Sequence, residues 1–565
     1  MLDASGGLAP HLKANPIKLR ILGWQHNKEF NEAVNFWRET LLATDAPQKV
    51  YEYPQNCGSP FRFLIRRSPA FAEVSGGRGM PNIAIEPRFR PLIKQRGIQI
   101  GEPALLFANR SGTGIVRDAH PVRGIMDNRP FDFPLTVQGY GTEIRLAVVC
   151  PKSETQFLQP YLANLGGRIT PGQQEADYLP TYPGFRSAFG LDLTVAEPGG
   201  PGWIICPEPA GSDIRTNSVE IGRSLNRSIE MLQASFSPHL VLIFFPERWS
   251  RYRGFDTESE RFNVHDFVKA SSVQKGIGTQ FLDQSTLSDR LQCRVRWWLS
   301  LAFYVKSMRT PWVLDGLDRD SAFVGLGMSY DPNQEHGKKV VMGCSHIYSS
   351  RGEGLQYRLS QIENPVFHGK NPYLSRDDAR RVGEQIRDLF FESRSALPKR
   401  VVIHKRTHFT RDEQQGLREG LSGVSQIEML EIVIEDTLRY VASAVDRYGK
   451  LSEDNYPVRR GSVVQLDDFA ALIWVHGVTS AISSSGHYYQ GKRRIPAPLS
   501  IRRHAGQSDV KALAEEILGL SKMNWNTFDL YTKLPATVQS SNEIARIGSL
   551  LGHFQPRAYD FRLFI

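Results

Sequence analysis

The chain has 565 residues, a formal net charge of +10, and 41% hydrophobic and 23% charged residues, which is the composition of a globular protein. No apolar run reaches the roughly 18 residues that a membrane-spanning helix needs, and the first residues lack the apolar core of a signal peptide. We therefore expect a cytoplasmic protein without a membrane partner. The five cysteines are far apart and never form a CxxC pair, which argues against a disulfide framework or a zinc cluster. The positive charge favours polyanionic partners.

The first 142 residues divide into two segments. Residues 1–97 alternate short mixed patterns such as IKLRILGW (17–24) and FRFLIRR (61–67), which predict a small α+β region of uncertain role. Residues 98–142 are rich in Gly, Pro, Asp and Arg and have few periodic apolar positions, so they predict an extended lead-in lying over a neighbouring domain, with a plain linker as the alternative.

Strands and helices alternate from residue 143 to residue 311. The predicted strands are IRLAVVC (144–150), GWIIC (202–206) and HLVLIFFP (239–246), and the predicted helices cover 153–165, with Ser153 as N-cap, and 218–233. Such alternation predicts a parallel sheet covered on both faces, and ligands of such sheets bind at the carboxyl ends of the strands.

Four polar residues within this segment predict an anion site. His265 and Lys269 are four residues apart and share one helix face. Gln280 follows a Gly-x-Gly turn, and Lys306 lies near the end of a long apolar helix. The loop after Pro246 leads to His265 and Lys269, so we expect the site at the carboxyl edge of the sheet. A histidine by itself is more often a helix cap or a core residue, but its spacing to three partners favours the site.

Residues 312–565 show a different order of elements. Two strands predicted as antiparallel neighbours (321–331 and 338–349) and a third (354–362) come first, then a helix from Ser375, whose side chain with Asp378 forms a capping box, and then a strand, a helix and a strand (399–405, 411–421 and 427–436). This is the element order of an RNase H-like fold, an analogy of order alone. The last residues, YDFRLFI, predict a docked strand, and the carboxylate of Ile565 would be a fixed negative charge and a potential metal ligand.

Over roughly residues 100 to 565 the chain resembles a short prokaryotic Argonaute. The resemblance rests on the order of His265, Lys269, Gln280 and Lys306, on FVGLGMS and VVIHK, and on the ending KMNW…LPATV…YDFRLFI. It implies a Rossmann-like MID domain at 143–311 and an RNase H-like PIWI domain at 312–565. In that family the MID site holds the 5′-phosphate and first nucleotide of a guide strand. The resemblance puts His265 beneath the first base, the other three residues on the phosphate, and Mg²⁺ between the guide phosphates and the carboxylate of Ile565.

The same resemblance predicts a PIWI domain without slicing activity. Slicing Argonautes hold two metal ions with a set of carboxylates. The first, in the pattern V-G-x-D, is matched here by Gly327, and the one in H-R-D-G-x-F is matched by Arg406, a guanidinium that cannot be deprotonated. The chain is therefore not expected to be an enzyme. Two alternatives remain: an active metal-dependent nuclease with a rearranged acid set, for which Asp331 and Asp412 are the nearby acids, and a phospholigand-binding α/β enzyme.

The resemblance also implies partners. They are a guide, RNA rather than DNA, a complementary single-stranded DNA target, and an effector chain that carries an Argonaute N-lobe-like region with an NADase or nuclease, in a defence system. Residues 1–97 depart from the minimal MID-PIWI pattern and weaken the case for such a partner. Basic residues of a late loop are candidate backbone contacts, with a solvated loop as the alternative: Lys492, Arg493, Arg494, Arg502 and Arg503.

Overall fold

The computed structural model divides the chain into two compact units, which are described separately. The first comprises residues 1–102, 433–502 and 509–515, and the second comprises residues 103–432, 503–508 and 516–565. The predicted MID segment lies wholly in the second unit, whereas the predicted PIWI segment contributes residues to both units. The division into four segments at 97, 142 and 311 stays a prediction. None of the helices in the described residues is long and apolar enough to span a bilayer. The described residues are 50–53, 61–64, 71–73, 83–85, 97–173, 175–257, 260–318, 320–330, 340–348, 356–435, 443–445, 448, 451–453, 457–480, 482, 486–491, 496–548 and 559–564.

The first unit is built from antiparallel strands where it is described. One sheet has the order β27-β26-β25-β5, with bounds Leu499–Ala505, Ala470–Trp474, Ser462–Gln465 and Ile98–Gln99. Val458, Leu472 and Trp474 pack together against it. Three hairpins are β1 (Val50–Tyr53) with β2 (Phe61–Leu64), β3 (Phe71–Glu73) with β4 (Ile83–Ile85), and β23 (Ser443–Val445) with β24 (Leu451–Glu453). Of the two patterns named for residues 1–97, FRFLIRR contains β2, and IKLRILGW lies outside the described residues.

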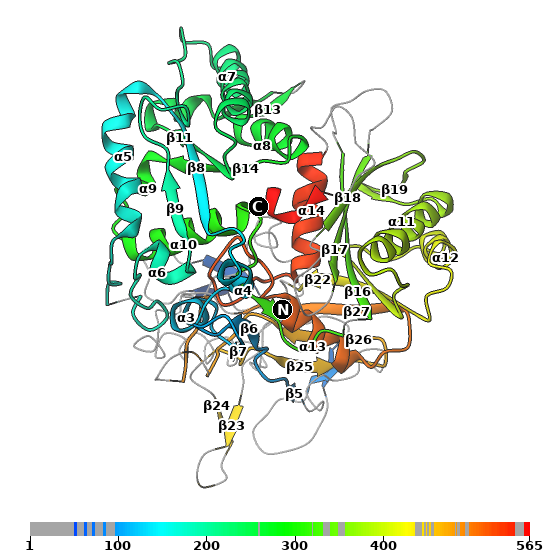
Figure 1. Cartoon of the computed structure of the whole chain (residues 1–565). Helices are drawn as coiled ribbons and strands as arrows, with labels where there is room; N and C mark the ends of the chain where they lie inside the picture. The colour runs from blue at the N-terminus through cyan, green and yellow to red at the C-terminus, as the bar shows by residue number, and fades with distance from the viewer. Residues whose placement is uncertain are drawn as a thin grey trace. The chain divides into compact units, whose positions relative to one another are not determined.

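A parallel sheet forms the first half of the second unit (Figure 1). Its order is β10-β8-β11-β14, with β9 also paired to β8, and every pair is parallel. The strands are β8 (Glu143–Cys150), β9 (Asp192–Val195), β10 (Trp203–Ile205), β11 (Leu240–Phe245) and β14 (Gly278–Asp283). All six residues of β11 are buried, which is the expected burial of a strand covered on both faces and confirms the parallel α/β prediction.

Helices α5 to α10 cover this sheet. Their bounds are Thr155–Ala163, Phe185–Phe189, Ile214–Ser235, Val264–Gln274, Gln284–Leu287 and Gln292–Lys306. The start of α5 differs from the expectation, because a 3₁₀ turn, η4 (Lys152–Glu154), precedes it and contains Ser153. Ser153 does not cap α5; its hydroxyl accepts a hydrogen bond from Arg248, 2.8 Å away, since Arg248 offers a charged donor.

The lead-in is folded, whereas the composition predicted an extended segment. β6 (Leu105–Ala108) pairs with β7 (Ile115–Asp118) and with β15 (Val313–Leu314), and two short helices follow, α3 (Pro121–Asp127) and α4 (Phe133–Val137). Leu105 and Phe107 alternate into the interior, and α3 buries Val122 and Ile125. β6 and β7 have only four residues each, so their patterns were too short to stand out among the glycines and prolines.

A mixed sheet forms the second half of this unit. Its strands are β28, β18, β17, β16, β21 and β22 in that order, with bounds Tyr559–Asp560, Gln356–Ile362, Val340–Tyr348, Ser321–Tyr330, Arg400–Lys405 and Gln426–Ile434. β16 to β18 are antiparallel and β16, β21 and β22 are parallel, as predicted for an RNase H-like arrangement. The hairpin of β19 (Val366–His368) and β20 (Asn371–Tyr373) precedes α11.

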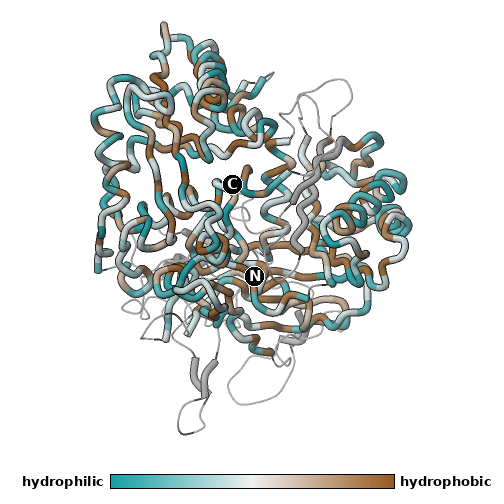
Figure 2. Tube along the Cα trace, in the orientation of Figure 1, coloured by the Kyte–Doolittle hydropathy of each residue, from teal (hydrophilic) through white to brown (hydrophobic). Residues whose placement is uncertain are grey.

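Helices lie on both faces of the mixed sheet (Figure 1). α11 (Arg376–Arg394) and α12 (Arg411–Gly420) share a hydrophobic core with one face, and α14 (Ala536–Gly548) packs on β16 and β17. Figure 2 shows both hydrophilic and hydrophobic residues on α11 and α12, as expected for helices with one face in the core. The Ser375 side chain accepts from the backbone of Asp378 at the start of α11, as the capping prediction required. α13 (Val510–Leu520) precedes α14.

The end of the described chain is not the single strand that YDFRLFI predicted. β28 has two residues, and the 3₁₀ turn η7 (Phe561–Leu563) follows it. The Asp560 side chain caps this turn by accepting from the backbone of Arg562, which ends the strand. η7 packs against α10 and β14, and Arg562 donates to the carbonyl oxygen of Met308, 2.6 Å away.

Candidate nucleic-acid-binding site

Two buried lysines meet at one backbone oxygen. The Nζ atoms of Lys269, on α8, and Lys306, the last residue of α10, each donate to the carbonyl oxygen of Thr279 over 3.1 Å. Lys306 also donates to Oε1 of Gln280 over 2.7 Å. The side chains are almost wholly enclosed, with Lys269 1% and Lys306 5% exposed. The structure thus brings together three of the four predicted residues.

Gly278 makes this convergence possible. It is the first residue of β14, and a Cβ atom there would lie 2.4 Å from the carbonyl oxygen of Lys306. Any side chain would therefore hold the end of α10 away from β14. Glycine lets the helix end approach the strand, which places Lys306 beside Thr279 and Gln280.

The fourth predicted residue, His265, lies at the open side of the cluster. It is in the first turn of α8, with its side chain 48% exposed. Its ring centroid is 5.0 Å from that of Phe281 on β14, and its Nδ1 is 3.1 Å from Oδ1 of Asp266. Asp266 also pairs with Arg546 of α14. An exposed ring face beside buried cations is suited to a phosphorylated ligand with a planar base.

Burial shifts the titration of the two lysines. It lowers the pKa of Lys269 to about 8, an effect opposed by the contact with Lys306 and the charge of Asp266. Burial, together with repulsion from Lys269, holds the pKa of Lys306 well below its usual range. Buried charges are costly unless they are compensated, so a multiply charged anion would stabilise the protonated pair.

The free protein should become more stable as the pH rises above about 8. Lys269 titrates near 8 when folded and near 10.5 in its ordinary state, so between these values the unfolded chain binds more protons and the free energy of unfolding rises with pH. The gain is at most on the order of 3 kcal/mol. Urea denaturation at about pH 7.5 and 9.5 measures it, with Lys269→Met as the reference; equal pH slopes in the two proteins would contradict the origin assigned here.

The site lies at the amino edge of the parallel sheet, so the expected position at the carboxyl edge was wrong. Thr279 and Gln280 are the second and third residues of β14, and Gly278 pairs with Leu240, the first residue of β11. A crossover helix runs antiparallel to the strands it connects. The later turns of α8 and α10 therefore return to the amino edge and carry Lys269 and Lys306 with them.

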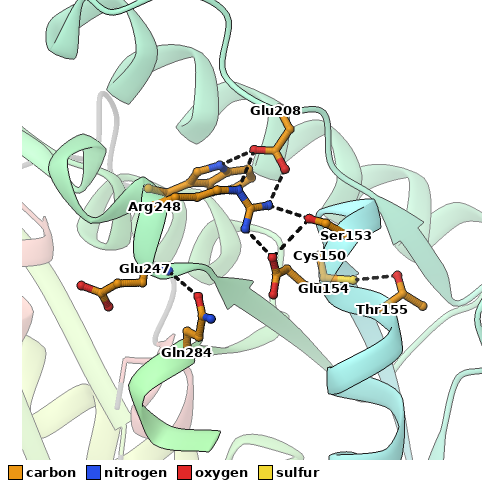
Figure 3. Close-up of polar contacts among 9 residues, drawn as sticks. Cys150, Ser153, Glu154, Thr155, Glu208, Glu247, Arg248 and Gln284 are labelled. Carbon is orange, nitrogen blue, oxygen red and sulfur yellow. Dashed lines mark hydrogen bonds and ion pairs between the residues drawn. The ribbon is translucent and has the colours of Figure 1, made fainter. Parts of the chain in front are cut away.

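The carboxyl edge is occupied by the protein's own side chains (Figure 3). Arg248, which follows β11, pairs with Glu154, which follows β8, and with Glu208, which follows β10. Oε1 of Gln284, after β14, accepts from the backbone of Glu247 at 2.9 Å. These contacts tie together the loops after four strands and fill the place where ligands of open parallel sheets commonly bind.

Gly327 and Arg406, which the resemblance matches to catalytic carboxylates, follow a pair of residues on neighbouring strands. Leu326 of β16 pairs with Lys405 of β21, so Gly327 and Arg406 follow at the same level. A Cβ atom on Gly327 would lie 2.4 Å from the carbonyl carbon of Ser541 in α14. Arg406 is exposed. Among the residues that the structure describes, no group of three or more His, Cys, Asp or Glu side chains is arranged to hold a metal ion.

Two of the five predicted backbone-contact residues lie in the described part of the chain. Arg502 is exposed on β27, and Arg503 donates to the carbonyl oxygen of Ser508. Five residues named from the sequence lie outside the described residues: Asp331, Lys492, Arg493, Arg494 and Ile565.

The described side chains of the site do not by themselves fit a divalent cation. A protonated lysine cannot ligate a metal ion, and Oε1 of Gln280 already accepts from Lys306.

Sequence reasoning missed four contributors: Asp266, Thr279, Phe281 and Arg546. Asp266 is three residues after the N-cap Asn263 and reads as an ordinary first-turn acid. Thr279 acts through its backbone, which no side-chain pattern shows. Arg546 is 280 residues from Asp266, so no local signal links them.

The second unit is an α/β fold that combines a parallel sheet with a mixed sheet. No protein-family model matches the chain. It is 27% identical over 315 residues to the Argonaute protein of Aquifex aeolicus (strain VF5), which covers 54% of this chain and 38% of that protein. The chain is thus similar to an Argonaute protein over about half of its length.

Solved structures share its fold. Clostridium butyricum Argonaute, bound to a guide DNA and a 19-mer target DNA, matches with a TM-score of 0.59 and 15% identity, over 86% of this chain and 57% of that one. A. aeolicus Argonaute matches with a TM-score of 0.52 and 17% identity over 86% and 57%. Drosophila Piwi matches with a TM-score of 0.53 and 14% identity over 83% and 55%. The chain thus spans little more than half the length of these solved relatives.

Proposed function

We propose that this chain is the guide-binding subunit of a prokaryotic defence system of the short Argonaute kind. It binds a 5′-phosphorylated guide, RNA rather than DNA, and pairs it with complementary single-stranded DNA. Pairing activates an effector in a partner chain, an NADase or a nuclease, and this chain does not cut the target. The convergence of Lys269 and Lys306 on one carbonyl oxygen, in a chain similar to an Argonaute protein, carries the proposal.

The proposed anchoring uses the residues already in place. A phosphate oxygen replaces the carbonyl oxygen of Thr279 as the acceptor for the two lysines, and charge-assisted bonds to phosphate are stronger than those to a neutral carbonyl. Gln280, held by Lys306, presents its amide beside them. The exposed ring of His265 then offers a stacking face for the first base, a contact of about 1 to 3 kcal/mol.

The absence of slicing is proposed from Gly327 and Arg406. Two-metal hydrolysis needs anionic ligands that hold two metal ions about 3.5 to 4 Å apart. Gly327 offers no ligand and has the backbone of α14 against its Cα, while Arg406 adds a positive charge beside it. These two features support target recognition over target cleavage.

The partner chain in this proposal follows from the resemblance to short Argonautes alone.

Guide binding by the purified chain tests the proposal. Guides of one sequence, as RNA and as DNA, are compared with a 5′-phosphate and with a 5′-hydroxyl. We expect the phosphate to tighten binding about 100-fold, as two charge-assisted bonds imply. No preference for the phosphate would refute the anchor, and guide-dependent cleavage of target DNA with Mn²⁺ would refute the inactive assignment. Mass spectrometry of co-purifying chains identifies the effector.

A further inference from the structure

Asp266 is the residue that connects the open side of the anion site to a second helix. Its Oδ1 contacts Nδ1 of His265 over 3.1 Å, and its Oδ2 pairs with Arg546 of α14. The carboxylate side chain is only 14% exposed. One carboxylate thus holds two groups that come from different helices, with one oxygen for each.

The ionisation of Asp266 determines what it can do for the imidazole. Burial acts to raise its pKa, but the bonds and charges of His265 and Arg546 prevail and hold the pKa below its usual value. An ionised carboxylate only accepts hydrogen bonds. Nδ1 of His265 must therefore carry the proton in this contact, which leaves Nε2 without one when the ring is neutral.

The imidazole is fixed on a second side as well. The Phe281 ring lies with its centroid 5.0 Å from that of His265, at an interplanar angle of 57°. Phe281 belongs to β14, the strand that supplies Thr279 and Gln280. The edge of the imidazole is thus held by Asp266 and one side by an aromatic ring on the strand of the site.

We propose that Asp266 is a positioning residue for nucleotide recognition: it fixes the tautomer and the orientation of His265 and locks them to α14 through Arg546. This inference rests on the proposed guide-binding function. A side chain held in one orientation before binding loses less entropy when a base stacks on it. Asp266 therefore acts mainly on the surface that stacks on the first base, while its charge has a smaller effect on the pKa of Lys269.

The first test reads the tautomer directly and needs no guide. In protein labelled with ¹⁵N-histidine, the ring ¹⁵N chemical shifts of His265 should show a protonated Nδ1. The signals of His265 are those that disappear in His265→Phe. Asp266→Asn should reverse this, because the guanidinium of Arg546 only donates and so attracts the amide oxygen. The amide nitrogen then faces Nδ1, which must accept, and the proton moves to Nε2. An Nε2-protonated parent, or an unchanged tautomer in Asp266→Asn, would overturn the proposal.

The second test separates the base from the phosphate. Binding is measured for 5′-phosphorylated guides with an intact or an abasic first nucleotide, and for the intact guide with a 5′-hydroxyl. In the parent, removal of the base should weaken binding about tenfold, within the range for one stacked base. In Asp266→Ala the same removal should cost less than about twofold, with the preference for a 5′-phosphate retained.

The control is Asp377→Asn, which removes one negative charge from an exposed first-turn position of α11. It should behave as the parent with all three guides. A tenfold base effect that persists in Asp266→Ala would overturn the proposal, as would equal losses of the base and phosphate effects, which would mean a purely structural role. If the parent binds guides with a 5′-phosphate and a 5′-hydroxyl equally well, the proposed function is refuted. The tautomer of His265 is tested independently of that result.

Discussion

Replacing Lys269 by methionine should remove the preference of this protein for guides with a 5′-phosphate. Methionine has a similar volume and no charge, so the substitution deletes one of the two buried ammonium groups while it keeps the packing of α8. Loss of one partner from a buried charged contact costs about 2 kcal/mol or more, which is about 30-fold in Kd. Lys269→Glu should abolish binding of 5′-phosphorylated guides, since it puts a negative charge against the phosphate. Titration of labelled guides with either 5′ end measures both variants.

The matched control is Lys275→Met at the end of the same helix. The side chain of Lys275 pairs with Glu230 over 2.6 Å and takes no part in the contacts of the site. This variant should bind both guides as the parent does. Phosphate-dependent binding that survives in Lys269→Met would show that the anchor lies elsewhere.

Lys269→Met should leave the free energy of unfolding unchanged or raise it. Burial and the neighbouring Lys306 both disfavour the charged form of Lys269. Apolar replacement of buried charges is often neutral or stabilising. Thermal unfolding of the free protein measures this, and a large loss of stability would indicate that Lys269 has a mainly structural role.

Replacing Gly327 should be strongly destabilising, although it lies outside the guide site. An added Cβ would lie 2.4 Å from the carbonyl carbon of Ser541 and 2.6 Å from the backbone nitrogen of Asn542. These atoms belong to α14, so the whole helix must shift to relieve the contact. We expect Gly327→Ala to cost about 3 kcal/mol, the upper part of the range for overpacking, and Gly327→Asp to cost more.

Gly166→Ala is the control for this prediction. A Cβ at Gly166 would meet no atom within 4 Å, so the change in stability should be below about 0.5 kcal/mol. Urea denaturation compares the variants. Equal stability of Gly327→Ala and the parent would show that α14 is not packed as described.

The contact between an added Cβ at position 327 and α14 also predicts the result of placing acids at positions 327 and 406. Gly327→Asp combined with Arg406→Asp should not produce Mn²⁺-dependent cleavage of a guided target. The carboxylate at 327 has no room without displacement of α14, so two restored acids cannot form the paired metal site. Cleavage by the folded double variant would contradict this reasoning and favour the alternative of an active nuclease lineage.

The local elements were within reach of sequence reasoning. HLVLIFFP is apolar at nearly every position and became the buried strand β11. Ser375 and Asp378 were read as a helix start, and the structure has that cap. The lead-in and the last strand were misjudged, because their patterns are too short to separate a two- to four-residue strand from a loop.

Residue types and their spacing likewise predicted the chemistry of the anion site. A histidine and a lysine four apart, with an amide and a distant lysine, predicted a group of anion ligands, and the structure joins Lys269, Gln280 and Lys306 around Thr279. Their roles toward a guide remain predictions. The spacing did not predict which edge of the sheet carries the site, because this depends on the direction in which α8 and α10 run across the sheet.

The sequence by itself determined the buried strand β11, the starts of α11 and α12, and which residues are charged, because these follow from short-range periodicity and side-chain chemistry. The tertiary structure alone decided three things: that the end of α10 approaches β14 at Gly278, that α14 lies against Gly327, and that Arg546 meets Asp266. Each depends on backbone surfaces brought together from distant parts of the chain. A contact made by backbone atoms, or by the absence of a side chain, leaves no residue pattern from which it could be predicted.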